Sequence, residues 1–481
     1  GNLIQSSTPS LFNNLPGAVL ALNGWQSTTS SWSANLNNQG TVNKNNGAVQ
    51  FTFLSNTVTN PGQLNINSGE FFANANTFTN TGAIAGNPGT TLRTGTTTFS
   101  HNSGAVITGV PTLIVSAGTC NLNTGSSVNT LDQLSITGGT LNCGIAVNTA
   151  AFTFSGGTLN GPQAVNVSTG GAFTWTGGII GSSGILNLAS GSTSTFNPGA
   201  TTLFLSGTIN NNGTWTMQSG NLAQSGTPSL FNNLSGAVIA LNGWQSTTSS
   251  WSANLNNQGT VNKNNGAVQF GYTSGGFANL TGGVWNINSG TWSNATLATQ
   301  SGAINIAAGA TLTSSSTLNF SGTTITNNGS ITTPSVVFLG TALQQLGGNG
   351  SINALTINNA SGVGLVGDQQ VNNTLTFTSG LINAPANALV LASAATVTGA
   401  NASRYVNGAV RWNYPTGSGV QRVFPIGGAT AFTPLTLNFA SIGNGGTLTA
   451  RSVDGDHPQV NTSLIAPNKS VNRHWALNNN G

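Results

Sequence analysis

A short internal period of about 20 residues constrains the fold of this chain more than any other feature. Four segments alternate apolar and small polar residues and then reach a glycine turn. They begin at Leu113 (LIVSAGTCN), Leu134 (LSITGGTLN), Phe152 (FTFSGGTLN) and Phe173 (FTWTGGIIG), at steps of 21, 18 and 21 residues. Alternation with a period of two residues predicts β-strands.

Asparagine and glycine mark the corners between these strands. The pattern Asn-x-x-Gly recurs at Asn37, Asn210 and Asn256, and both residue types tolerate positive φ. Short strands, such corners and a period near 20 predict an all-β parallel β-helix (β-solenoid), because stacked coils bury apolar faces that one coil cannot. About 20 coils at roughly 4.8 Å each would form a rod of about 95 Å. A set of β-sandwiches is the alternative.

A much longer repeat divides the chain. Residues 1–51 recur at 220–270 with four differences, namely Ile4/Ala223, Ser7/Gly226, Pro16/Ser235 and Leu20/Ile239. We therefore expect a solenoid unit at 1–219 and a second, diverging unit at 220–400. Basic, aromatic and proline residues increase after residue 400 and the short period stops, which predicts a separate β-sandwich-like module at 401–481.

Charged residues are scarce, and this excludes several classes of function. The chain has nine Lys or Arg and five Asp or Glu in 481 residues, or 3%, against about 25% in ordinary soluble domains. So few basic residues cannot neutralise a row of phosphates, so nucleic-acid binding is not expected. No apolar run approaches the length of a membrane span.

The segments Gly348–Trp412, Gln421–Phe439 (QRVFPIGGATAFTPLTLNF) and Val471–Gly481 (VNRHWALNNNG) resemble secreted multi-repeat surface proteins of Bacteroidota. Residues 1–347 resemble only the broader style of filamentous-haemagglutinin-like adhesins. The resemblance implies export, by the type IX route, and an extracellular or cell-surface location. It brings no catalytic signature. The family's module would continue past residue 481, so we expect a fragment of a longer protein.

Catalytic chemistry is not expected. Polysaccharide-degrading β-helix enzymes need clustered carboxylates, whereas Glu70, Asp132 and Asp368 are 62 and 236 residues apart. The bases before residue 400 are equally scattered. Lys44 and Lys263 occupy the same position in the two copies, which we interpret as a repeated surface feature. We therefore predict a protein that is not an enzyme and has no cofactor.

Three small sets of residues are candidates for binding or cross-linking. Asp454 and Asp456 could offer oxygens to calcium, although a solvated turn is the preferred interpretation. Three isolated histidines, including His101 in an expected exposed corner, give no metal-binding spacing. Aligning the coils places Cys143 two positions along the strand from the place opposite Cys120, so a disulfide between them would be strained. Buried free thiols are the other alternative.

The repeated tryptophans allow two interpretations. Trp25 and Trp32 recur as Trp244 and Trp251. Exposed indoles could bind extracellular glycan, whereas buried ones would fill wide coils; we favour burial. The Thr-rich lines TGTTTF and GSTSTF lack the strict coil-by-coil repetition of an ice-binding array.

The open β-edge of a solenoid end is a template for further strands, and end-to-end stacking does not close, so it produces fibres. The sequence therefore predicts an extracellular structural protein, a rigid stalk, fibre or matrix filament that associates end to end. A glycan-binding adhesin is the alternative.

Overall fold

The structure is a computed structural model that describes residues 10–23, 29–45, 50–53, 57–242, 248–264, 269–272 and 276–480. The fold is all-β, with 60% strand, 1% helix and a parallel β-solenoid of about 18 turns. This confirms the predicted fold class, with slightly fewer turns than expected. The chain forms two compact units, one of Gly1–Gln245 with Ser250–Leu255 and one of Ser246–Ser249 with Asn256–Gly481. The predicted boundaries at 219/220 and 400/401 stay predictions.

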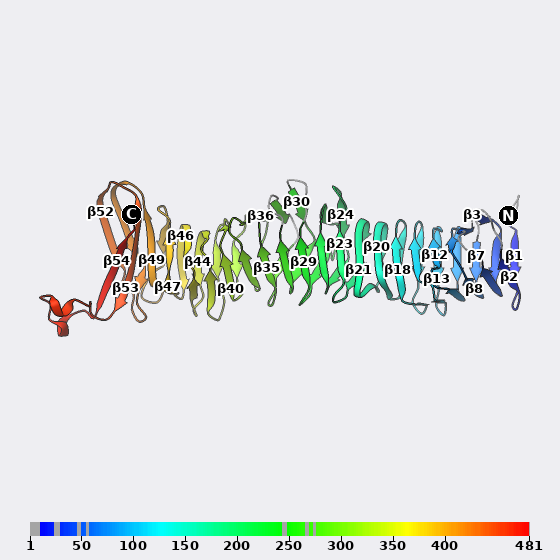
Figure 1. Ribbon diagram of the computed structural model, residues 1–481, viewed down its shortest axis with the longest axis horizontal. Coiled ribbons are helices and arrows are strands. Elements are labelled where there is room, and N and C mark those ends of the chain that lie inside the picture. Colours follow the sequence, from blue (N-terminus) through cyan, green and yellow to red (C-terminus); the bar gives the residue numbers. More distant parts are fainter. Residues whose placement is uncertain are drawn as a thin grey trace. The chain divides into compact units, whose positions relative to one another are not determined.

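Each turn of the first unit contains three short strands, which stack on the strands of the neighbouring turns as three faces (Figure 1). The first face begins with β1 (Leu11–Asn14), β4 (Asn35–Asn38), β7 (Thr57–Asn60), β10 (Thr77–Asn80), β13 (Thr98–His101), β16 (Thr119–Leu122) and β19 (Thr140–Cys143). The second face begins with β2 (Val19–Leu22), β5 (Thr41–Lys44), β8 (Gln63–Ile66), β11 (Ala83–Gly86), β14 (Val106–Thr108) and β17 (Ser127–Val128). The third face begins with β3 (Thr29–Trp32), β6 (Gln50–Phe53), β9 (Glu70–Ala73), β12 (Thr91–Thr94), β15 (Thr112–Val115) and β18 (Leu131–Ile136).

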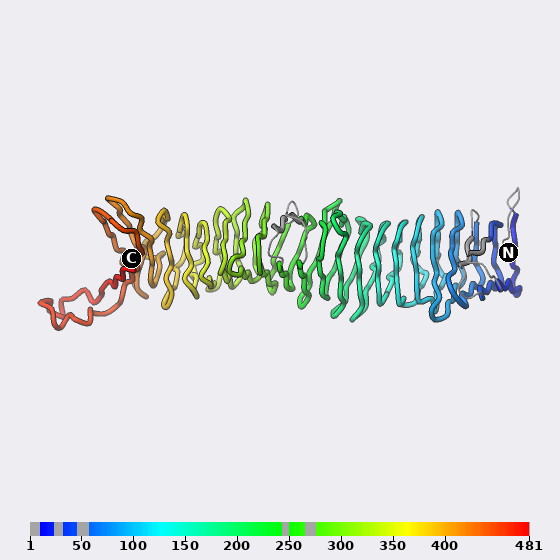
Figure 2. Tube along the Cα trace, turned by 45° about the horizontal axis from the view of Figure 1, so that its top comes forward, coloured from blue at the N-terminus to red at the C-terminus, as the bar shows by residue number. Residues whose placement is uncertain are grey.

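The successive turns are visible as a regular winding of the chain trace in the first unit (Figure 2). Two long strands, β20 (Val147–Asn160) and β21 (Ala164–Ile180), bend through all three faces. The second face then continues with β22 (Ile185–Leu188), β25 (Thr208–Asn211) and β28 (Leu230–Asn233). The third face continues with β23 (Thr193–Phe196), β26 (Thr214–Met217) and β29 (Val238–Leu241). The first face continues with β24 (Thr202–Leu205), β27 (Asn221–Gln224) and β30 (Thr248–Trp251).

Alternate residues of each strand point inward, so the core consists of columns with one residue per turn. In β10 and β13, Phe78 lies over Phe99 with ring centroids 5.2 Å apart. Aromatic rings stacked at this spacing add to the free energy gained by burial. Both rings are almost fully buried, and this is the packing that the period-two alternation predicts.

The second copy of the repeated block does not lie on the same faces as the first. Strand β1 belongs to the first face, whereas the identical sequence LFNN in β28 belongs to the second face. Likewise β3 lies on the third face and its copy β30 on the first. The block therefore recurs ten turns and one face later. The two copies share inward residues such as Asn14 and Asn233, but their strands stack in different columns of the solenoid.

The second unit is also wound from parallel strands. One face contains β32 (Thr260–Lys263), β35 (Val284–Ile287), β37 (Ala303–Ile306), β40 (Thr324–Asn327), β43 (Gln344–Gly347), β45 (Val363–Val366) and the start of β47 (Ile382–Leu391). A second face contains β33 (Gln269–Tyr272), β36 (Thr291–Asn294), β38 (Thr311–Ser314), β41 (Ser330–Ile331) and the start of β44 (Ser351–Asn358). It continues through β46 (Gln369–Ser379), the end of β47 and β49 (Val406–Tyr414).

Parallel pairing extends past residue 400, because Leu391 of β47 pairs with Trp412 of β49. Antiparallel strands follow: β49 pairs with β53 (Gly446–Asp454), β53 pairs with β54 (Arg473–Asn479), and β50 (Gly417–Phe424) pairs with β52 (Leu435–Ile442). The sandwich-like form of the last module is not confirmed. Among the described residues the helices are short 3-10 turns at Val460–Thr462 and Pro467–Lys469, and none could span a membrane.

Candidate functional site

The tryptophans that the structure describes in the repeated block are buried. Trp32 is 6% exposed and Trp251 is 1% exposed. Their indole Nε1 atoms donate to the carbonyl oxygens of Ala34 at 2.8 Å and Ala253 at 3.0 Å. Neither ring offers a face on which a sugar could stack, so neither can be the predicted glycan contact. Trp25 and Trp244 lie outside the described residues.

Cys120 and Cys143 are both buried free thiols. They point inward from neighbouring strands, but Cys120 pairs with Leu141 while Cys143 pairs with Leu122. This is the diagonal offset that disfavoured a disulfide, and the structure contains none between them. Burial raises the pKa of the Cys120 thiol to about 12, so the thiol stays protonated near neutral pH and is a poor nucleophile.

The candidate calcium carboxylates have protein partners. Asp454 accepts hydrogen bonds from Nε and Nη2 of Arg473, at 3.0 Å and 2.7 Å. Asp456 accepts a hydrogen bond from the Ser470 hydroxyl. In the part of the chain that the structure describes, no three His, Cys, Asp or Glu residues gather as metal ligands would. The geometry therefore favours the preferred interpretation, an exposed turn, and adds an ion pair between Asp454 and Arg473 that the sequence did not predict.

The prediction that Lys44 and Lys263 form a repeated surface feature is wrong. Lys44 lies in an inward column between Leu22 and Ile66, and both lysines are 1% exposed. The Nζ atom of Lys44 donates to the Ser68 carbonyl oxygen at 2.5 Å, and that of Lys263 to the Ser289 carbonyl oxygen at 2.6 Å. The alternation of TVNK puts valine and lysine on the same side of the strand, so both point inward.

Burial alters the titration of these lysines. It lowers the pKa of Lys263 to about 8. It also lowers the pKa of Lys44, although the nearby Glu70 carboxylate opposes this effect. The position of Glu70 holds Thr291 in the second copy, so only the first copy has this acid. The repeated lysine is thus a core residue whose amine is held at a corner.

A polar ladder runs through the core of the first unit. Each asparagine of the series Asn14, Asn38, Asn60 and Asn80 donates its Nδ2 to the Oδ1 of the next, at 2.7, 2.6 and 2.7 Å. The last amide donates to Nδ1 of His101 at 2.9 Å, and Nε2 of that ring donates to the Ser127 carbonyl oxygen at 3.0 Å. His101 is therefore buried. The prediction that it lies in an exposed corner is wrong.

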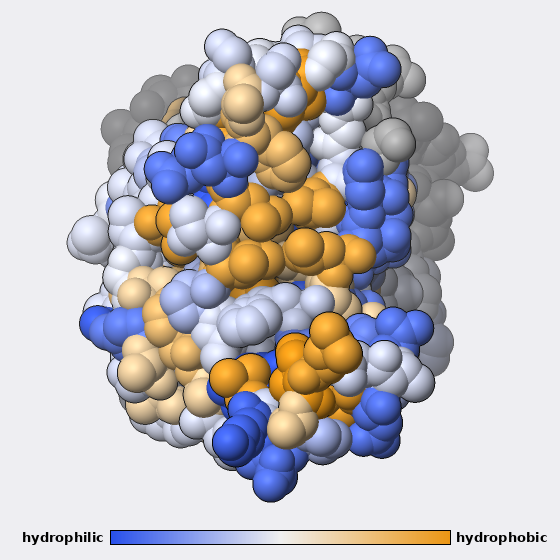
Figure 3. Space-filling view, turned by 90° about the vertical axis from the view of Figure 1, so that its left-hand side faces the viewer, coloured by the Kyte–Doolittle hydropathy of each residue, from blue (hydrophilic) through white to orange (hydrophobic). Residues whose placement is uncertain are grey.

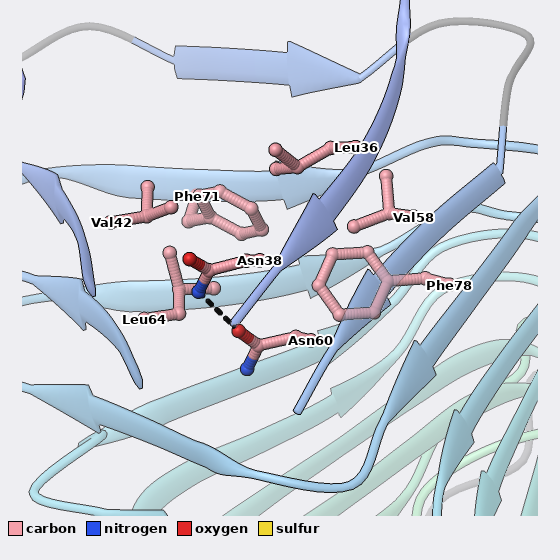
Figure 4. Close-up of a pocket in the computed structure, with 8 residues that line it drawn as sticks. All are labelled: Leu36, Asn38, Val42, Val58, Asn60, Leu64, Phe71 and Phe78. Carbon is pink, nitrogen blue, oxygen red and sulfur yellow. Dashed lines mark hydrogen bonds between the residues drawn. The ribbon is translucent and has the colours of Figure 1, made fainter. Parts of the chain in front are cut away.

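The small cavity in Figure 4 belongs to this ladder and is not a ligand site. It is lined by Asn38 and Asn60 together with six apolar side chains, namely Leu36, Val42, Val58, Leu64, Phe71 and Phe78. Its volume of about 10 Å³ is at the lower limit for one water molecule. The amides in it are already hydrogen-bonded to each other. The cavity is a packing gap between columns.

The last strands of the second unit expose apolar side chains. Val423 is 49% exposed, Phe439 36%, Trp475 41% and Leu477 49%. Figure 3 shows apolar side chains gathered at the centre of the face formed by this end of the chain. Phe439 packs edge-on against Tyr414, with centroids 5.3 Å apart. The β50–β52 hairpin therefore contacts β49 but leaves much of its own surface open.

A polar hollow in the described part of the second unit lies beside β49, and we call it the Asp368–Arg411 groove. Its volume is about 700 Å³, and it is lined by Asn349, Asp368, Gln370, Val390, Arg411, Asn413, Thr447 and Asn480. A volume of this order is typical of small-molecule sites. The sequence identified Asp368 as an isolated acid, but the structure brings it to Arg411, with Oδ2 and Nη1 3.1 Å apart.

The groove is built from one outward column of the solenoid. Gln370, Val390 and Arg411 are neighbours on successive strands β46, β47 and β49. Asp368 precedes β46, and its Oδ1 accepts from the backbone N–H of Ala388 at 2.8 Å. The steps of 20 and 21 residues along this column match the short period. That period is the signal by which sequence reasoning could have placed Arg411 near Asp368.

Comparison with known proteins identifies no relative. The chain matches no protein-family model, no curated protein and no solved structure.

Proposed function

We propose that this chain is an extracellular structural protein, a rigid β-solenoid that serves as a stalk, fibre or matrix filament and performs no catalysis. One observation carries the proposal: the near-identical block recurs with the same inward residues but on a different face. A binding surface repeated for avidity is useful only where both copies can engage the same target together. A repeated packing element has no such requirement.

The interior supports a mechanical role. Many of its polar groups bond along the columns, as the Asn14–His101 ladder does, and backbone ladders join the described strands of neighbouring turns within each unit. Rows of uncharged side chains also bond outside the core. Asn166, Asn187, Asn210 and Asn232 each donate to the asparagine of the preceding turn, at 2.8 to 2.9 Å. Such ladders resist separation of the turns.

The proposal includes end-to-end association of copies. Phe12 in β1 is 39% exposed, whereas its copy Phe231 in β28 is fully buried because Ile209 of the preceding turn lies over it. Val19 in β2 is 62% exposed. The edge formed by β1 and β2 therefore fits a turn like that of β25 and β26. The extracellular location rests on the resemblance to secreted surface proteins of Bacteroidota.

Electron microscopy of the purified chain at rising concentration tests this function. Long uniform fibres with an axial repeat near one chain length would establish filament formation through the coil edges. Separate rods at every concentration would support a monomeric stalk and reject self-association. Compact particles, or turnover of a polysaccharide panel by the pure protein, would reject the structural role.

A further inference from the structure

We propose that the Asp368–Arg411 groove is a binding site for a neutral saccharide. This inference goes beyond the structural role and does not depend on it. The ligand class follows from the charge of the lining, the unused hydrogen-bonding groups and the pairing of the strands beneath the groove.

The lining carries no net charge. Asp368 and Arg411 are the charged residues among the groove's described lining residues, and they pair with each other. The guanidinium charge is already neutralised for an anionic ligand, and the carboxylate charge is already neutralised for a cation. Each of these side chains is one-third exposed, so the pair faces the groove. A neutral, strongly hydrogen-bonding ligand fits this lining best.

The pair matches the hydroxyl groups of a sugar. A hydroxyl both donates and accepts, so one hydroxyl can donate to the Asp368 carboxylate and its neighbour can accept from Arg411. Nη1 of Arg411 forms the ion pair with Asp368 at 3.1 Å, and Nε donates to the Thr449 hydroxyl at 3.4 Å. Its other N–H groups have no partner in the described structure. Neither has the side-chain amide of Asn413, which lies two residues further along β49.

The carboxylate is held in place before any ligand arrives. Oδ1 of Asp368 accepts from the Ala388 N–H, and the backbone N–H of Asp368 donates to Oδ1 of Asn349 at 3.0 Å. Fixed polar groups reduce the entropy lost on binding. Val390, 8% exposed, gives the floor an apolar patch against which the C–H face of a sugar ring can pack.

An extended peptide is the competing ligand, and the topology disfavours it. Peptides that add to a sheet need a free strand edge. Strand β49 under the groove is paired on one side with β47 and on the other with β53. The strand therefore has partners on both sides from Ala409 to Trp412 and offers a peptide no free edge there.

The test is binding of the full chain to an array of neutral oligosaccharides of four to six sugars, with sulfated and sialylated glycans and random peptides on the same array. We expect retention of a neutral glycan, and at least tenfold weaker binding by Arg411→Met and Asp368→Asn. Asn413→Trp, which fills the groove and leaves the ion pair intact, should also abolish binding. It keeps the test valid if the ion-pair variants misfold.

Arg93→Met is the matched control. Arg93 pairs with Glu70 at 3.0 Å and is exposed to a similar degree, but it belongs to the first unit and does not line the groove. Its binding should equal that of the parent protein. The proposal is rejected if no neutral glycan is retained, if only charged glycans or peptides bind, or if Arg411→Met and Asn413→Trp bind normally. Rods or fibres seen by electron microscopy are unaffected by any of these results, so the two proposals fail separately.

Discussion

His101 occupies a place in the core that asparagine holds in the preceding turns. Its neutral ring accepts from Asn80 and donates to Ser127. A proton on Nδ1 would set an N–H against the Asn80 amide N–H. Burial accordingly lowers the pKa of His101, and its hydrogen bond to the Ser127 carbonyl offsets this effect only in part.

This arrangement predicts acid sensitivity. Because the folded pKa is below the ordinary 6.5, the unfolded chain binds the proton first. The stability from this group is complete above pH 6.5 and is lost as the pH falls from 6.5 toward the lowered value. Urea unfolding midpoints between pH 7.5 and 5 should fall for the parent protein. His101→Asn, which restores the amide of the preceding turns, should remove most of that slope. Parallel slopes for the two proteins would contradict the prediction.

The buried Lys263 makes the stability of the protein depend on pH in the alkaline range. Its folded pKa of about 8 lies below the ordinary 10.5, so its stability contribution is complete above pH 10.5 and is lost as the pH falls to 8. Cys120 has the opposite effect. Its pKa is raised in the folded protein, so the unfolded chain loses the thiol proton first and the protein loses stability above pH 9. The difference in unfolding midpoint between the parent protein and Lys263→Met cancels the thiol effect. As the pH rises from 8 to 10.5, the midpoint of the parent protein should therefore increase relative to that of Lys263→Met.

At the scale of the element, the inner ladder predicts unequal roles for adjacent asparagines in β4. Asn38 points inward, bonds Asn14 and Asn60, and is 1% exposed, whereas Asn37 lies outside and bonds Asn13. Asn38→Ala leaves buried partners unsatisfied and should lower the free energy of unfolding by about 2 to 4 kcal/mol. Asn37→Ala should stay within about 0.5 kcal/mol. Urea denaturation measures both, and equal losses would argue against the ladder as a source of stability.

The strands were predictable from the sequence, but which polar residues point into the core was only partly predictable. Alternation placed Phe78, Phe99 and their neighbours inside. The same alternation places Lys44 inside, whereas its recurrence as Lys263 led us to predict a repeated surface feature; buried lysines are rare. The core hydrogen bonds of Asn38 depend on Asn14 and Asn60, which lie 24 and 22 residues away, close to the short period. The sequence analysis assigned asparagine to the corners and did not predict that these amides point inward.

The groove illustrates why sites were harder to predict than strands. Asp368 and Arg411 are 43 residues apart, about two turns, and the sequence analysis identifies only Asp368, as a scattered acid. Their meeting depends on the number of residues in each intervening turn, which is 20 and 21 here but is, for example, 18 or 24 elsewhere in the solenoid. A single altered corner would move Arg411 away from Asp368. The same variability sets the one-face rotation between the copies of the repeated block.

At the scale of the whole molecule, a solenoid is a stack in which each turn contacts its neighbours, and its stability is nearly a sum over turns. Thr77 pairs with Thr98 in the next turn. Removing Thr77–Thr97 therefore deletes one complete turn and joins Asn76 to a residue equivalent to Thr77. Val58 would then pack on Phe99, and Asn60 would donate to His101 as Asn80 does.

The chain that lacks Thr77–Thr97 should fold, with a far-UV circular dichroism spectrum like that of the parent and a small decrease in urea midpoint. The matched control removes only Thr77–Gly86, which contains β10 and β11 but not the third-face strand β12. The third-face strands β9 and β12 then follow each other directly, and one must loop out or every later column loses its partner. This shorter deletion should destabilise the protein far more than the longer one. If both deletions unfolded the chain equally, turns would not be independent units, and a rod built by adding turns would lose its physical basis.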